Sequence, residues 1–116
     1  MSADWPSGWS RGLLDVAILA VLADDDAHGY AISQTLQARG FGRITGGGLY
    51  PVLGRLEEAA LVEAAWDHSE AGPGRKGYRL TGTGRAALGE HARAWDRFSS
   101  AVDRLLATAE ETREDS

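Results

Sequence analysis

Cysteine is absent from this sequence of 116 residues, and proline occurs only three times. Without cysteine the chain has no disulfide framework, no thiolate metal site and no thiol nucleophile. The three histidines, His28, His68 and His91, fall on separate predicted elements, so nothing indicates that they converge on a metal. We therefore expect neither a metal nor any other cofactor.

Long apolar runs are missing as well. The longest, from Leu13 to Ala23, is interrupted by Asp15 and falls well short of the roughly 20 residues that span a bilayer. No basic segment precedes it, and Asp24 to Asp26 follow it, which is unlike a secretory signal. We expect a cytoplasmic protein that does not bind membranes.

Positive charge is scarce, because 12 Lys and Arg face 17 Asp and Glu, which gives a net charge of −5 at pH 7. This balance argues against a nucleic-acid binder held by bulk electrostatics. The acidic residues cluster, however, at Asp24 to Asp26 and between Glu110 and Asp115. A local basic face elsewhere on the surface stays compatible with the composition.

Hydrophobic periodicity predicts three helices in the first half of the chain. The first runs from Ser10 to Asp24 and is apolar nearly all round, which predicts deep burial. Asp26 is the expected N-cap of a short second helix that stops at Gly40. Thr45 is the expected cap of a third helix, whose apolar residues form one continuous stripe: Leu49, Val52, Leu53, Leu56 and Ala60.

A β-hairpin and a long helix follow. Residues 61–67 and 76–80 predict two strands, joined by a turn around Gly72-Pro73-Gly74. Thr81 is the expected cap of a final helix that runs to about Ala109. A helix of this length cannot bury its apolar stripe against so small a body, so we expect a homodimer. The predicted dimer interface is Leu88, Ala92, Trp95, Ser99, Val102 and Leu106.

Helix, helix, turn, helix and hairpin is the order of a winged helix-turn-helix. The predicted fold is therefore mainly α with a β-hairpin wing and a long C-terminal dimerisation helix. We divide the chain into an N-terminal arm (1–9), a DNA-binding domain (10–81), a dimerisation helix (82–109) and an acidic tail (110–116) expected to be disordered. The same element order also occurs in protein-interaction domains, so the order alone leaves both functions open.

Three ordered motifs carry a family resemblance: His28-Gly29-Tyr30-Ala31-Ile32, residues 49–57, and residues 72–81 with Gly84. Together they resemble the PadR family of transcriptional regulators, and its short form in particular, over roughly residues 13–106. The resemblance implies a dimeric regulator, usually a repressor, that binds a pseudo-palindromic operator and is released by an effector in some members. This sequence departs from the family pattern at three positions, which usually hold an aromatic residue, a glycine and a hydroxyl residue: Gly77, Ala60 and Gly48.

The face of the third helix opposite its apolar stripe is the predicted reading surface, with Gly47, Pro51, Gly54, Arg55 and Glu58. Only Arg55 can contact a guanine edge in bidentate fashion, and its alternative is an intrahelical pair with Glu58. The glycines allow close backbone approach. We therefore expect recognition largely through DNA shape.

Further contacts with the DNA backbone are expected around this surface. The resemblance gives Tyr50 a phosphate contact, although its ring can instead cover the core. Arg75 and Lys76 suit phosphates or the minor groove, with a solvated turn as the alternative. Arg43 and the exposed amides after Thr45 are further anion sites. The full predicted interface is Arg43, Thr45, Gly47, Gly48, Tyr50, Pro51, Gly54, Arg55, Arg75 and Lys76.

Trp95 and Phe98 on the long helix are candidates for an effector site. In a two-fold dimer each lies near its symmetry mate, and facing indoles can sandwich a flat aromatic ligand. The resemblance adds that a tryptophan at the matching place stacks on ligands in some relatives. Trp9 can line the same space. The alternative is that Trp95 is simply a large residue of the dimer interface.

An enzyme has little support. Residues 82–87 match the G-x-G-x-x-A string of dinucleotide-binding proteins, but the second parallel strand and the acidic residue of that unit are missing. We predict that the chain is not an enzyme. The competing hypothesis is a dimeric module of the same fold that binds a small molecule or a protein without operator-specific DNA binding.

Overall fold

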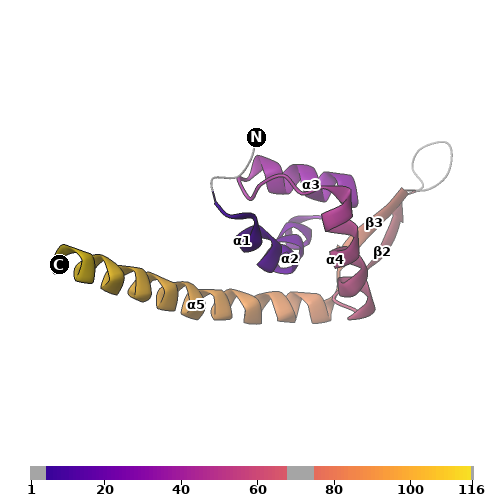
Figure 1. Cartoon of the computed structure of the whole chain (residues 1–116). Coiled ribbons are helices and arrows are strands. Elements are labelled where there is room, and N and C mark those ends of the chain that lie inside the picture. The colour runs from indigo at the N-terminus through magenta and orange to yellow at the C-terminus, as the bar shows by residue number, and fades with distance from the viewer. Residues whose placement is uncertain (1–4, 68–74, 116) are drawn as a thin grey trace.

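The computed structural model describes residues 5–67 and 75–115. A small helical body carries a hairpin on one side, and one long helix projects from the other (Figure 1). The molecule measures 67 × 32 × 21 Å along its principal axes, and this helix accounts for the long dimension. The elements, in chain order, are α1 (Ser7–Gly12), α2 (Leu14–Asp24), β1 (Ala27–His28), α3 (Gly29–Ala38), α4 (Gly46–Glu58), β2 (Val62–Asp67), β3 (Arg75–Leu80) and α5 (Gly82–Asp115).

Helix α2 is the centre of the core. Its side chains Ile18 and Leu19 are fully buried, and it packs against α3, α4, α5 and β3. Complete burial of each such side chain stabilises the fold by about 1.5–3 kcal/mol. The predicted apolar helix is thus confirmed, and its nearly uniform hydrophobicity is explained by neighbours on several sides.

The predicted start of this helix at Ser10 is wrong. The chain forms two helices instead, because the backbone leaves helical geometry at Leu13, with φ −113° and ψ 7°. Gly12, a poor helix former, stands immediately before the break. Residues 7–9 of the expected arm are therefore helical and belong to α1.

The hairpin is part of a three-stranded antiparallel sheet in the order β1-β3-β2. Strands β2 and β3 pair from Val62 opposite Leu80 to Asp67 opposite Arg75, as the sequence predicts. Strand β1 was not predicted, since two residues show no periodicity and the strand exists only by pairing with β3. The predicted turn around Gly72-Pro73-Gly74 lies outside the described residues.

Strand β1 also corrects the expected cap of the second helix. The N-cap of α3 is His28, which makes no side-chain capping bond, and Asp26 instead pairs with Arg79 across an Nε–Oδ2 distance of 3.2 Å. Thr45, in contrast, caps α4 as predicted, since its Oγ1 accepts a hydrogen bond from the Gly48 amide. Thr81 does the same for α5 through the Gly84 amide.

Helices α3 and α4 end in the same hydrogen-bond pattern, the Schellman motif. At α3 the Phe41 amide donates to the Leu36 carbonyl, and Gly40 takes the left-handed conformation with φ +87°. At α4 the Leu61 amide donates to the Leu56 carbonyl, and the left-handed residue is Ala60, with φ +60°. The predicted stop at Gly40 is confirmed, and Ala60 stands after α4, where the family pattern usually has glycine.

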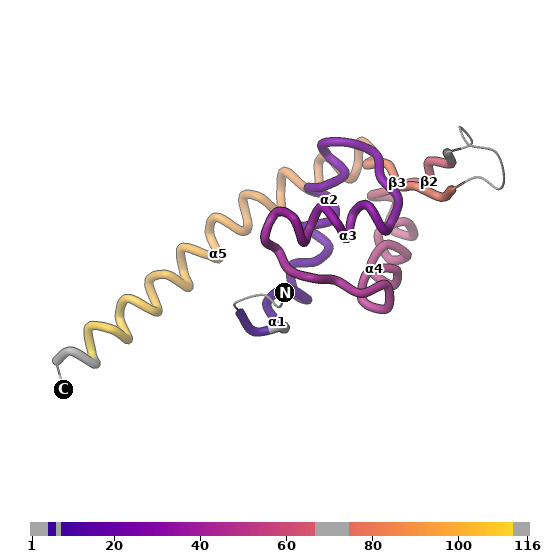
Figure 2. The backbone as a smooth tube through the Cα atoms, turned by 90° about the horizontal axis from the view of Figure 1, so that it is seen from above, coloured from indigo at the N-terminus to yellow at the C-terminus, as the bar shows by residue number. Residues whose placement is uncertain are grey.

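Helix α5 begins tightly against the body and then leaves it (Figures 1 and 2). A Cβ on Gly84 would lie 1.9 Å from the Leu61 carbonyl oxygen, so only glycine fits there. Gly84 belongs to the G-x-G-x-x-A string at residues 82–87, so this glycine is explained by close packing against the body. The helix continues to Asp115, so its expected end at Ala109 is wrong, and residues 110–115 are helical rather than disordered.

No helix within the described residues combines the length and the apolar character needed to cross a membrane.

Candidate nucleic-acid interface

Helix α4 divides into a buried face and an exposed face. Leu49, Val52, Leu53 and Leu56 are buried in the core, which confirms four of the five residues of the predicted stripe. The fifth, Ala60, was predicted wrongly, because it lies beyond the end of α4 and is exposed. On the opposite face the predicted reading residues, Gly47, Pro51, Gly54 and Arg55, are all exposed. Among the described residues no ion pair joins Arg55 to Glu58, so the structure does not contain the alternative considered for this arginine.

Tyr50 lies where α4 approaches the start of α3. A Cβ on Gly29 would be 2.6 Å from the Tyr50 hydroxyl oxygen, so the tyrosine ring uses the space that a side chain at position 29 would take. The residue is still 52% exposed. Both interpretations of Tyr50 are therefore compatible with its position, because the ring packs on α3 while the side chain stays accessible at the surface.

Polar side chains surround Tyr50. A surface pocket of about 500 Å³ lies between α3 and α4 and includes Tyr30, Gln34, Arg43 and Thr45. The Gln34 side-chain amide donates a hydrogen bond to the Tyr30 hydroxyl. Tyr30 and Gln34 were not among the predicted interface residues, because the sequence alone did not show that this side of α3 adjoins Tyr50.

The two cations of the wing have different surroundings. Lys76 Nζ lies 3.0 Å from Glu57 Oε1 on α4 and 5.3 Å from the centre of the Tyr78 ring. The hydrogen bond to Glu57 raises the pKa of Lys76, while burial raises the pKa of Tyr78. Arg75 is exposed at the start of β3. Lys76 must therefore exchange Glu57 for a phosphate to contact DNA, whereas Arg75 gives up no ion pair with any described residue.

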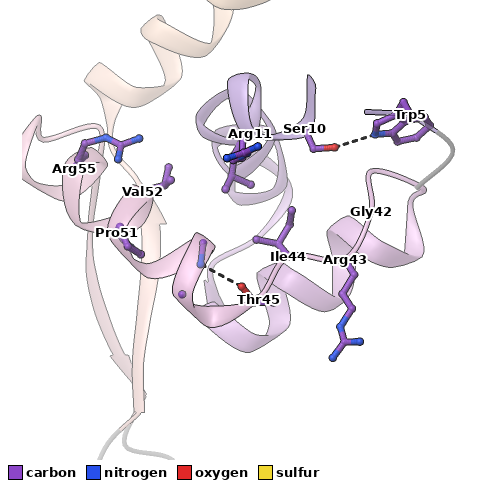
Figure 3. Close-up of a pocket in the computed structure, with 13 residues that line it drawn as sticks. Trp5, Ser10, Arg11, Gly42, Arg43, Ile44, Thr45, Pro51, Val52 and Arg55 are labelled. Atoms are coloured by element: carbon purple, nitrogen blue, oxygen red, sulfur yellow. Dashed lines mark hydrogen bonds between the residues drawn. The ribbon is translucent and has the colours of Figure 1, made fainter. Parts of the chain in front are cut away.

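A larger pocket of about 750 Å³ runs beside residues 47–55 of α4 (Figure 3). We call it the basic groove, because Arg11, Arg43 and Arg55 line it together with Thr45. Arg43, Thr45 and Arg55 were predicted from the sequence. Arg11 was not, since no motif includes it and the helix predicted from Ser10 gave no sign that this residue lines the same pocket as α4.

A second, apolar pocket of about 460 Å³ lies between the N-terminal segment and α5. We call it the aromatic hollow. Its lining brings together Trp9 and Trp95, which are distant in the sequence, and adds two aromatic residues that the sequence did not indicate, Trp5 and Phe41. Phe98 lines a smaller adjoining pocket, with its ring centre 6.4 Å from that of Trp95.

The predicted dimer interface is mostly uncovered in the single chain. Trp95 and Leu106 are 47% and 64% exposed, and Phe98, which was predicted for the effector site and not for this interface, is 63% exposed. Ala92 is also exposed, and Ser99 and Val102 are half-buried. Leu88 differs from the rest of the stripe, because it packs against the core of its own chain. The first residue of the predicted interface thus belongs to the body.

Helices α2, α3 and α4 pack together, α4 exposes one face, and the β2–β3 hairpin follows α4. This arrangement defines a winged helix-turn-helix protein. The model of the family described as "Transcriptional regulator PadR-like family" matches residues 18–90 of this chain. The chain therefore belongs to this family. The predicted family and fold are therefore confirmed. As a member of a family of transcriptional regulators, the chain is not an enzyme.

Individual relatives agree with this assignment. The chain is 36% identical over 94 residues to the transcriptional regulator Rv3488 of Mycobacterium tuberculosis, an alignment that covers 81% of this chain and 86% of that protein. It is similar to the solved PadR-like transcriptional regulator of Bacillus cereus, with 33% identity, a TM-score of 0.73, and coverage of 83% of this chain and 93% of that chain. The PadR family transcriptional regulator of Eggerthella lenta gives 35% identity and a TM-score of 0.74, with 85% and 82% covered.

Proposed function

We propose that this regulator is a repressor that binds a pseudo-palindromic operator in double-stranded DNA as a homodimer. The observation that carries the proposal is the division of α4 into a face fixed in the core and an exposed face flanked by cations. The exposed face offers Arg55 to base edges, Arg43 lines the same groove as Arg55, and Lys76 of the wing reaches α4 through its ion pair with Glu57. A rigid helix with one accessible face is what entry into the major groove requires.

The proposed dimer is supported by α5. A contiguous exposed stripe of large apolar side chains is unusual on a monomer in water, and Trp95, Phe98 and Leu106 make such a stripe. A second copy of α5 can cover it in an arrangement with two-fold symmetry. That arrangement would also place two copies of α4 for the two halves of one operator.

The aromatic hollow supports a small aromatic effector. Its lining is almost entirely apolar, and Trp9 and Trp95 offer ring faces on which a flat ligand can stack. Because Trp95 also belongs to the proposed dimer interface, ligand binding there would affect how the two protomers are placed. A change in that placement would alter the distance between the two α4 helices and release the operator.

DNA binding is tested by selecting operators in vitro from random duplexes, then measuring affinity at several salt concentrations. We expect a two-fold symmetric site and an affinity that falls with salt. The double variant Arg75→Ala, Lys76→Ala should bind more weakly and with a smaller salt dependence. Failure of the wild type to enrich any duplex would contradict the proposal, and aromatic binding without DNA binding would favour the ligand-binding module.

The effector site is tested by tryptophan fluorescence with a panel of planar aromatic compounds. Quenching by a bound compound should be lost in Trp95→Ala and retained in Trp66→Ala, since Trp66 lies on β2 and outside the hollow. Equal quenching of the wild type and Trp95→Ala would remove Trp95 from the site.

A further inference from the structure

The basic groove gathers positive charge in a protein that is acidic overall. Its lining comes from three segments: residues 5–14, which include α1 and the start of α2, the turn at residues 42–45, and residues 47–55 of α4. Figure 3 shows Arg55, Arg11 and Arg43 spaced along it. Among the described residues that line it, three are arginines and none is acidic, whereas the whole chain carries a net charge of −5. The groove is thus a local exception to the overall charge.

The floor of the groove strengthens the effect of these charges. Leu14 and Val52, both buried in the core, contribute to the lining, and Ile44 is half-buried beside them. An apolar surface beneath a charge lowers the local dielectric constant, so an anion is attracted more strongly than on a fully solvated surface. Guanidinium groups suit phosphate oxygens in particular, because their planar donors can bind two oxygens at once.

We infer that the basic groove holds the phosphodiester backbone of one DNA strand and that Arg11 binds one of its phosphates. The inference rests on the DNA binding proposed above. If the exposed face of α4 enters the major groove, the strands that border that groove must pass along the sides of the helix. The basic groove follows one of these sides, and Arg11 lies between Arg43 and Arg55 along it (Figure 3).

The position of Arg11 is fixed by the short helix α1. Ser10, its neighbour, accepts a hydrogen bond of 2.9 Å from the Trp5 indole Nε1, and both residues line the basic groove and the aromatic hollow. Trp9 lines the hollow from the same helix. Helix α1 therefore takes part in the lining of both pockets.

The test measures the slope of log affinity against log salt for Arg11→Ala on the selected operator. Removing one bound phosphate from each protomer should reduce the slope by about 1.8, at about 0.9 per phosphate. Affinity should fall about tenfold or more for each phosphate that Arg11 no longer binds. Arg11→Lys keeps the charge and should restore most of the slope. Arg104→Ala, which removes the same charge from the distal half of α5, should leave it unchanged.

The outcomes separate this inference from the proposed function. If the wild type and Arg104→Ala bind the operator alike while Arg11→Ala keeps the wild-type slope, the backbone contact of Arg11 is refuted and DNA binding stands. A thermal melt of Arg11→Ala identifies a structural role, since a lower melting temperature with an unchanged slope also refutes the contact. If the wild type binds no DNA, the proposed function fails and the inference fails with it.

Discussion

Helices α4 and α5 have similar amphipathic sequences and opposite environments. The apolar stripe of α4 is covered by its own chain, with Leu49 and Leu53 no more than 1% exposed. The apolar stripe of α5 meets the body along the first half of the helix, with Trp95 lining the aromatic hollow, and its large side chains Phe98 and Leu106 remain exposed. An amphipathic pattern therefore predicts that a face will be covered, and it does not say by which chain.

The difference also separates the proposed roles. Because α4 is anchored by its own core, its free face can be presented to DNA without rearrangement. Because α5 lacks a partner within the chain, its stripe is available to a second protomer and its tryptophan to a ligand. Gly84 at the start of α5 contacts the Leu61 carbonyl just beyond the end of α4, and α1 takes part in the lining of both the basic groove and the aromatic hollow, so changes at either place should affect both regions.

The largest effect is expected from Gly84→Ala, which breaks the junction between α5 and the body. The added Cβ would lie 1.9 Å from the Leu61 carbonyl oxygen, and relief of that clash must move the helix or the hairpin. We expect a loss of about 4 kcal/mol in the free energy of unfolding, measured by urea denaturation. Gly82→Ala is the matched control, because a Cβ there meets nothing within 4 Å. A small effect in both variants would mean that the junction is loose.

The second test removes the partner of α5. Leu106→Glu places a carboxylate in the proposed dimer interface of both protomers, which should weaken dimerisation by about 3 kcal/mol, or more than ~100-fold in the dissociation constant. Sedimentation at micromolar concentration would then show a monomer. Arg104→Glu is the control, since residues two apart on a helix are about 200° apart around its axis. A wild type that sediments as a monomer would contradict the idea that a second protomer covers the apolar stripe of α5.

The third test concerns the end of α4, where Ala60 occupies a left-handed conformation. Such a conformation costs a residue with a Cβ roughly 1–2 kcal/mol, and glycine avoids most of this cost. Ala60→Gly should therefore raise the free energy of unfolding by about 1 kcal/mol, seen as a higher urea midpoint. Ala59→Gly, at φ −79°, should lower it instead. Stabilisation by both variants would argue against the strained turn.

The smallest effect is expected from Glu57→Gln, which tests whether the ion pair with Glu57 on α4 keeps Lys76 from binding a DNA phosphate. The Glu57–Lys76 pair is exposed, so its loss should change the free energy of unfolding by no more than about 0.5 kcal/mol. Operator binding should become a few-fold tighter, because Lys76 becomes available to a phosphate. Glu58→Gln removes the same charge without releasing Lys76. Equal gains in the two variants would show that Lys76 plays no particular part.

Several features escaped prediction because they depend on distant contacts. Strand β1 exists through its pairing with Tyr78 and Gly77, which follow it by about fifty residues. Arg11 joins the basic groove only because α1 folds back beside α4. Periodicity and capping rules describe neighbours within one helix or hairpin, and they carry no information on such encounters. The caps at Thr45 and Thr81 were predictable for the same reason, since both are local.

The sequence by itself determined the local structure: the helices and hairpin, the stripe of α4, the stop at Gly40 and, through its motifs, the family. Only the tertiary structure decided which faces are covered, which cations line one groove, and that Trp9 and Trp95 share one hollow. The physical reason is the distance along the sequence between the residues that interact. Helix caps and periodic stripes arise from residues a few positions apart, whereas grooves and hollows arise where segments distant in the chain pack together.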